Sequence, residues 1–167
     1  IGASVETVAK FIAGFEHTRV IAFDAPGVGE SPVPPLPYRL RDIAQLAARL
    51  LDHLGVTVAD VFGVSWGGAA AQEFAIRYPH RCSTLTLAAT SAGFVMVPGQ
   101  PGVATIARRS GAPVVPAAIR GTFEALVGQR FHVPRRHPLA VRFGPPLHVD
   151  RPRLARATRG AREEITR

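Results

Sequence analysis

Residues 60–79 read DVFGVSWGGAAAQEFAIRYP, and this stretch decides the fold. A short apolar run leads into the glycine-flanked Ser65, and an alanine-rich run follows until Pro79. A short apolar run suits a buried strand, alanine favours a helix, and proline cannot continue one. The stretch therefore predicts a strand, a tight turn that carries Ser65, and a helix over residues 67–78.

The turn itself carries the one sharp catalytic pattern, Gly-x-Ser-x-Gly at Gly63, Ser65 and Gly67. Between a strand and a helix, this pattern is typical of a nucleophile elbow. The serine of such a turn is strained, so the flanking glycines are expected to avoid Cβ clashes. The Ser65 hydroxyl would lie at the positive helix N-terminus, and the N–H of Trp66 would point at the oxyanion of a tetrahedral intermediate. A glycine-rich turn with an incidental serine is the alternative.

Further elements flank this stretch. Apolar periodicity predicts helices over residues 4–15 and 40–54, the second ended by Gly55. Continuous apolar runs predict strands at residues 20–23 and 85–89. This alternation of helices and strands predicts an α/β fold with a mainly parallel sheet covered by helices.

A second segment begins near Val97. Its pattern predicts a helix over residues 102–109 capped by Gly111, and strands at 114–119 and 139–143. Pro116 makes the first of these an edge or bulged strand. Asp150 is placed to cap a last, arginine-rich helix that runs to Thr166.

Composition excludes several classes of protein. At 167 residues, with 47% hydrophobic and 19% charged residues, the chain is neither disordered nor of low complexity. It contains no run of 18 apolar residues, which excludes a transmembrane helix. The single cysteine, Cys82, excludes an internal disulfide and a cysteine metal cage, and we expect no metal or cofactor.

The N-terminus and the charge distribution add two expectations. The chain begins with Ile1 rather than Met and shows no signal peptide, so we expect a cytoplasmic fragment or processed product. Residues 1–100 carry seven basic and eight acidic side chains, whereas residues 101–167 carry thirteen and four. The net charge of +8 therefore belongs to the second segment, which suits an anionic partner.

Residues 1–98 resemble the α/β-hydrolase superfamily, and within it the intracellular medium-chain poly(3-hydroxyalkanoate) depolymerases. The resemblance is carried by RVIAFDAPGVGES (19–31), PYRLRDIAQLAARLLDHLG (37–55), GVSWGG (63–68) and AATSAGFVMVPG (88–99). It implies a partial α/β-hydrolase domain in which Ser65 attacks the carbonyl of a small-molecule or polymer ester. It also implies an oxyanion hole formed by the backbone N–H groups of Trp66 and Ile1.

The partners of Ser65 are not identifiable in the sequence. In this superfamily an acid and then a histidine follow the nucleophile. Asp150 is the only aspartate after Ser65, and no histidine follows it. Glu73 falls in the helix after the turn, and Glu124 with His132 or His137 is formally possible. We expect impaired activity for this reason.

We interpret the other histidines as structural or surface residues. His80 follows Pro79 at a helix end, where it can interact with the helix dipole. His17 and His53 are expected to face solvent. Cys82 is expected to pack as a small apolar residue.

Residues 100–147 resemble a different family, the lysophosphatidic-acid-type glycerophospholipid acyltransferases. QPGVATIARRSGAPVVPAAIRGTFEAL (100–126) and LAVRFGPPL (139–147) carry this resemblance. It implies a partial α/β acyltransferase-like segment over residues 99–167. The family's histidine with an aspartate five positions later is absent, so its general base is missing.

Three functions are therefore open: an impaired serine ester hydrolase, an acyltransferase remnant (acyl-CoA to lysophosphatidate), and a non-catalytic basic module. The basic module would bind an anionic lipid surface through residues 101–167. No specific nucleic-acid binding is expected, because no helix-turn-helix, zinc-finger or RNP-type pattern is present. The junction between residues 97 and 102 could come from recombination, a frameshift or an assembly artefact.

Overall fold

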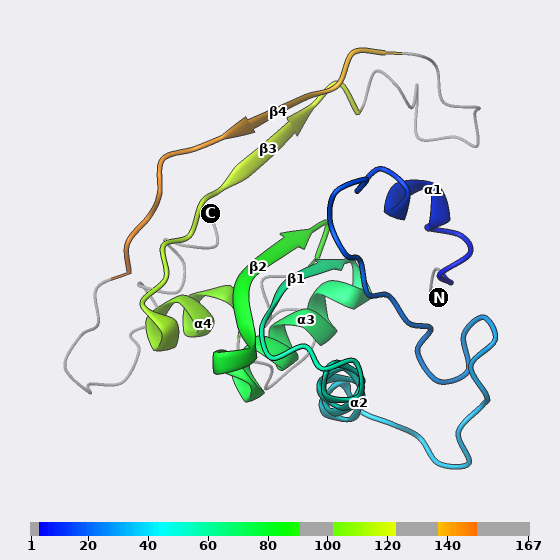
Figure 1. Ribbon diagram of the computed structural model, residues 1–167. Coiled ribbons are helices and arrows are strands. Elements are labelled where there is room, and N and C mark those ends of the chain that lie inside the picture. The colour runs from blue at the N-terminus through cyan, green and yellow to red at the C-terminus, as the bar shows by residue number, and fades with distance from the viewer. Residues whose placement is uncertain (1–3, 91–101, 123–136, 150–167) are drawn as a thin grey trace. The chain divides into compact units, whose positions relative to one another are not determined.

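The computed structural model describes residues 4–90, 102–122 and 137–149, and the chain divides into two compact units, Ile1–Gln100 and Pro101–Arg167. The first unit contains α1 (Ala9–Ile12), α2 (Leu40–His53), β1 (Ala59–Val64), α3 (Trp66–Arg77), the 3-10 helix η1 (Pro79–Arg81) and β2 (Cys82–Ala88) (Figure 1). The second contains α4 (Val103–Ser110), β3 (Ala117–Arg120) and β4 (Ala140–Phe143).

The sheet of the first unit is a parallel pair, as the sequence predicts. β1 and β2 lie side by side, with Val64 opposite Ala88 at their carboxyl ends (Figure 1). Parallel strands place their carboxyl ends at the same edge of a sheet. The residues that follow β1 and β2, which include Ser65, are therefore brought together at one edge.

One face of this sheet carries the core. Ala44, Ala48 and Leu51 of α2 are buried with Phe74 of α3, and Val61 of β1 packs against them. The alternation of β1 buries Gly63 on this side and leaves Phe62 and Val64 exposed on the other. Burial of apolar surface contributes about 25 cal/mol per Å² to the free energy of folding, and this contribution holds both helices against the strands.

The predicted helix over residues 40–54 is confirmed almost to the residue. The Arg39 N–H donates to the Asp42 carboxylate at 2.7 Å, which satisfies one of the free donors at the helix start. Gly55, with φ of 68°, ends the helix in the left-handed conformation that glycine adopts readily.

Arg81 joins the loop before β1 to the start of β2. Its guanidinium donates to the carbonyls of Thr57 (2.6 Å) and Val56 (2.8 Å). It also pairs with Asp52 of α2 at 2.8 Å. The planar, multi-donor group of arginine suits such a fork, and it holds α2 in place relative to the two strands.

Two predictions in the first unit are wrong. The helix expected over residues 4–15 is only α1, because its apolar face is covered in part: Phe11 stacks on Phe62 of β1, yet Phe11 and Phe15 remain 53% and 45% exposed. A short helix with a partly exposed apolar face is marginal in water. Residues 20–23 form no strand, since no described residue offers them a ladder partner.

In the second unit, the helix and both strands form near the predicted positions. Gly111, with φ of 73°, caps α4. β3 and β4 pair antiparallel rather than parallel, and the Val114–Leu147 bridge extends the ribbon beyond Pro116. The helix predicted over residues 150–166 lies outside the described residues. No helix in the described part of the chain has the length and hydropathy to span a membrane.

Replacement of the buried Phe74 tests the core. Phe74→Ala is expected to lower the free energy of unfolding by about 3–5 kcal/mol, through lost burial and the cavity left behind. Leu46→Ala, at a position of α2 that is 41% exposed, is the matched control and should cost far less. Urea unfolding followed by circular dichroism measures both. Equal losses for the two variants would contradict the assigned core.

Candidate active site

Ser65 occupies the sharp turn between β1 and α3. Its backbone has φ of 52° and ψ of −120°, a conformation that residues with a side chain rarely adopt. Such backbone strain costs about 1–3 kcal/mol and persists only when the surroundings enforce it. The residue is exposed, so its hydroxyl is accessible at the carboxyl edge of the sheet.

Hydrogen bonds from the end of β2 and from α3 enforce this conformation. The Ser65 N–H donates to the carbonyl of Ala88 at 3.0 Å, and the Gly68 N–H donates to the carbonyl of Ser65 at 3.0 Å. The Thr90 hydroxyl donates to the same Ser65 carbonyl at 2.7 Å. The main-chain N–H and C=O of Ser65 are thus both tied to neighbouring elements.

Steric constraints explain two glycines of the turn. A Cβ on Gly63 would lie 2.6–2.8 Å from atoms of Gly67, Gly68 and Ala71. Strand β1 and helix α3 can therefore approach closely only because Gly63 has no Cβ. A Cβ on Gly68 would lie 2.5 Å from the Thr90 side chain. A Cβ on Gly67 would meet nothing within 4 Å, so this position shows no steric need for glycine.

The backbone N–H of Trp66 opens α3. The first N–H groups of a helix have no partner within the helix and carry its partial positive charge. No described residue accepts a hydrogen bond from the Trp66 N–H. This donor is therefore available to an anion beside Ser65. Ile1, which the family resemblance implies as the second oxyanion donor, lies outside the described residues.

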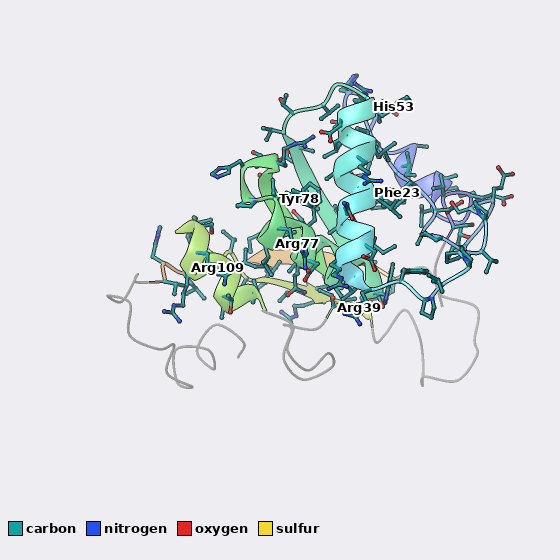
Figure 2. The ribbon with its side chains drawn as sticks, turned by 90° about the horizontal axis from the view of Figure 1, so that it is seen from below. Phe23, Arg39, His53, Arg77, Tyr78 and Arg109 are labelled. Atoms are coloured by element: carbon teal, nitrogen blue, oxygen red, sulfur yellow. The ribbon has the colours of Figure 1, made fainter. Side chains whose placement is uncertain are left out.

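His53 and His80 lie at the far edge of the sheet from Ser65. His53 ends α2, with Arg39 at the other end of that helix (Figure 2), and His80 lies in η1 just before β2. Since the strands run parallel, their N-terminal ends lie at the edge of the sheet opposite Ser65. The 6 residues of β1 span about 20 Å, so neither imidazole reaches the Ser65 hydroxyl.

The other polar candidates in the described part of the first unit do not complete a triad with Ser65. Glu73 forms an ion pair with Arg77 one turn along α3. His17 is exposed, as expected, and has no described contact with Ser65. Glu124, His132 and Asp150 lie outside the described residues. No cluster of metal-ligating side chains occurs in residues 4–90, 102–122 and 137–149.

Cys82 packs against the core, as the sequence predicts, and is unsuited to act as a nucleophile. Burial, and secondarily the Asp60 carboxylate, raise the pKa of its thiol, which favours the protonated form. Cys82 also pairs with Ala59 at the N-terminal ends of the two strands, away from Ser65.

Sequence reasoning missed Thr90 and Gly68 as parts of this site. Thr90 lies 25 residues after Ser65. The hydrolase resemblance of residues 88–99 implied no role for it. The available signal was its position: a hydroxyl side chain two residues after a parallel strand lies at the same sheet edge as the serine.

Comparison with known proteins identifies the family. Residues 1–131 match the family described as the alpha/beta hydrolase fold. The chain belongs to this family. The match crosses the boundary between the two units at Gln100 and supports the hydrolase resemblance alone. The acyltransferase-like interpretation of residues 100–147 stays a prediction.

Three relatives of this alpha/beta hydrolase illustrate the similarity. A poly(3-hydroxyalkanoate) depolymerase from Ectopseudomonas oleovorans is 56% identical over 104 residues, covering 62% of this chain and 37% of the relative. A 3-oxoadipate enol-lactonase 2 from Acinetobacter baylyi is 34% identical over 93 residues, covering 55% and 35%. The crystal structure of a hydrolase from Pseudomonas aeruginosa PA01 shares 39% identity at a TM-score of 0.52, covering 57% and 37%. The chain spans little more than a third of these proteins.

Alanine substitutions at two glycines test the geometry of the turn. Gly63→Ala is expected to lower the free energy of unfolding by about 1–3 kcal/mol, because the added Cβ overlaps α3. Gly67→Ala, which adds its methyl group to open space in the first turn of α3, should be neutral or stabilise by up to about 1 kcal/mol. Urea titration of both variants measures the difference. A Gly67→Ala variant as unstable as Gly63→Ala would contradict the described turn.

Proposed function

We propose that the chain is a serine-dependent ester hydrolase of the poly(3-hydroxyalkanoate) depolymerase type, with Ser65 as its nucleophile. The observation that carries this proposal is the strained, exposed Ser65 at the carboxyl end of β1, beside the free N–H of Trp66. Membership of the alpha/beta hydrolase family and the 56% identity to a depolymerase support it.

The reaction follows from the chemistry of the site. The Ser65 oxygen attacks the ester carbonyl, and the tetrahedral intermediate places its oxyanion against the Trp66 N–H. The bond to the alkoxy group then breaks, and the alcohol leaves with the proton that the Ser65 hydroxyl lost on attack. Water attacks the resulting acyl-enzyme, which releases the carboxylic acid and restores the serine hydroxyl.

The proposal includes impaired turnover. A serine hydroxyl is a weak nucleophile until a base takes its proton, and neither His53 nor His80 of the first unit lies within reach of Ser65. Stabilisation of the oxyanion alone retains part of the rate enhancement, since triad-deleted enzymes keep about 10³–10⁴-fold over water. Slow but serine-dependent ester cleavage is the expected behaviour.

Covalent labelling tests the nucleophile. A fluorophosphonate probe is expected to modify Ser65 slowly in the full chain and to leave Ser65→Ala unmodified, as read by peptide mass spectrometry. Ser83→Ala, at an exposed serine of β2, is the matched control and should label like the wild type. An unmodified Ser65, under conditions in which a complete depolymerase reacts, would refute the proposal.

Acyl transfer from acyl-CoA to lysophosphatidate should be undetectable.

The second unit supports a second candidate function, binding to an anionic lipid surface. The register of β3 and β4 places Ile119, Val141 and Phe143 on one face of the ribbon, where they are 58%, 53% and 74% exposed. Arg120 and Arg142 share the opposite face. An apolar face backed by cations is the pattern of elements that lie in the membrane interface.

The charge of this unit favours an anionic partner over a second copy of the chain. Its described residues include four arginines and no aspartate or glutamate, so none of these cations has a carboxylate partner within them. The four are Arg108, Arg109, Arg120 and Arg142. Two such surfaces would repel one another, whereas anionic headgroups would attract the arginines while the apolar face enters the interface.

Vesicle sedimentation tests this second candidate. Arg120→Gln and Arg142→Gln should each weaken binding to vesicles of phosphatidylcholine and phosphatidylglycerol roughly fivefold, at about 1 kcal/mol per cation. Arg49→Gln, an equal charge change on α2, is the control and should bind like the wild type. Equal binding to pure phosphatidylcholine, or stronger binding to RNA than to either vesicle, would refute the lipid-surface proposal.

A further inference from the structure

Thr90 makes a contact with the turn that the mechanism above does not use. Its hydroxyl donates to the Ser65 carbonyl at 2.7 Å, beside the 3.0 Å bond from the Gly68 N–H to the same oxygen. Ala89, with φ of 46°, redirects the chain after β2 and so brings Thr90 over the turn. The carbonyl of Ser65 thus has two donors from two different elements.

This carbonyl belongs to the same planar unit as the Trp66 N–H. The peptide bond between Ser65 and Trp66 is rigid, and in a trans peptide the C=O and N–H point in opposite directions. An interaction that fixes the direction of the Ser65 oxygen therefore also fixes the direction of the Trp66 hydrogen.

We propose that Thr90 is a positioning residue for the oxyanion hole. Its hydroxyl anchors the Ser65 carbonyl and so aims the Trp66 N–H at the place where the oxyanion develops. The inference rests on the proposed function of Ser65, because only an oxyanion beside that serine gives the aimed N–H a catalytic effect.

A specific kinetic signature follows. The oxyanion exists in the transition state and the intermediate but not in the bound ester or probe. Misdirection of the Trp66 N–H therefore slows the bond-forming step and leaves initial binding unchanged. For a fluorophosphonate, the maximal labelling rate falls while the concentration that gives half of it stays constant.

A packing role for Thr90 makes a different prediction. The Thr90 side chain fills the space in which a Cβ on Gly68 would lie, with Cβ, Oγ1 and Cγ2 all 2.5–2.6 Å from that point. Thr90→Val keeps the branched shape and removes the donor, whereas Thr90→Ser keeps the donor and removes the methyl group. The two variants separate positioning from packing.

The experiment measures labelling kinetics and amide exchange in the full chain. Thr90→Val should lower the maximal rate of Ser65 labelling about five- to tenfold with unchanged half-saturation, the effect of one lost hydrogen bond. It should also speed hydrogen exchange at the Gly68 amide by a similar factor. Thr90→Ser should match the wild type in both readouts, and far-UV circular dichroism verifies that both variants fold.

Each outcome decides the inference. A wild-type rate in Thr90→Val, or equal losses in both variants, overturns the positioning role. If wild-type Ser65 takes no label, the proposed hydrolase function fails. Hydrogen exchange at the Gly68 amide then tests, without labelling, whether Thr90 anchors the Ser65 carbonyl. Faster exchange in Thr90→Val with wild-type exchange in Thr90→Ser would still support the anchor, and unchanged exchange in both would refute it.

Discussion

The strained, positive-φ backbone of Ser65 links the site to the core of the first unit. A residue with a side chain adopts this conformation only if neighbouring groups compensate the strain. Ala88, the last residue of β2, accepts from its N–H, and Thr90, two residues later, donates to its carbonyl. The parallel pairing of β1 and β2 is therefore a requirement of the turn as much as of the core.

The packing of α2 and α3 serves the same arrangement. Phe74 and the small residues of α2 hold the helices on one face of the sheet, and Gly63 lets α3 begin close to β1. The first residue of α3 then presents the Trp66 N–H beside the serine. Core and site are thus two consequences of one strand–turn–helix unit.

Local sequence patterns predicted the parts of this unit that local physics controls. The glycine-flanked serine, the α2 helix with Gly55 at its end and the apolar β2 all follow from propensity and periodicity. Prediction failed where an element needs a neighbour: residues 20–23 have no described ladder partner, and the apolar side of α1 is only partly covered. Periodicity shows that a segment can pack, but it does not show whether a partner is present.

The sequence alone predicted a nucleophile elbow at Ser65, indicated a resemblance to the alpha/beta hydrolases and located the excess positive charge in residues 101–167. Only the tertiary structure decided which groups surround the serine. The bond from Thr90 to Ser65 joins residues 25 positions apart, and the distance of His53 and His80 from the serine follows from strand direction. Such relations depend on the register of paired strands, a long-range property that no local pattern of residues encodes.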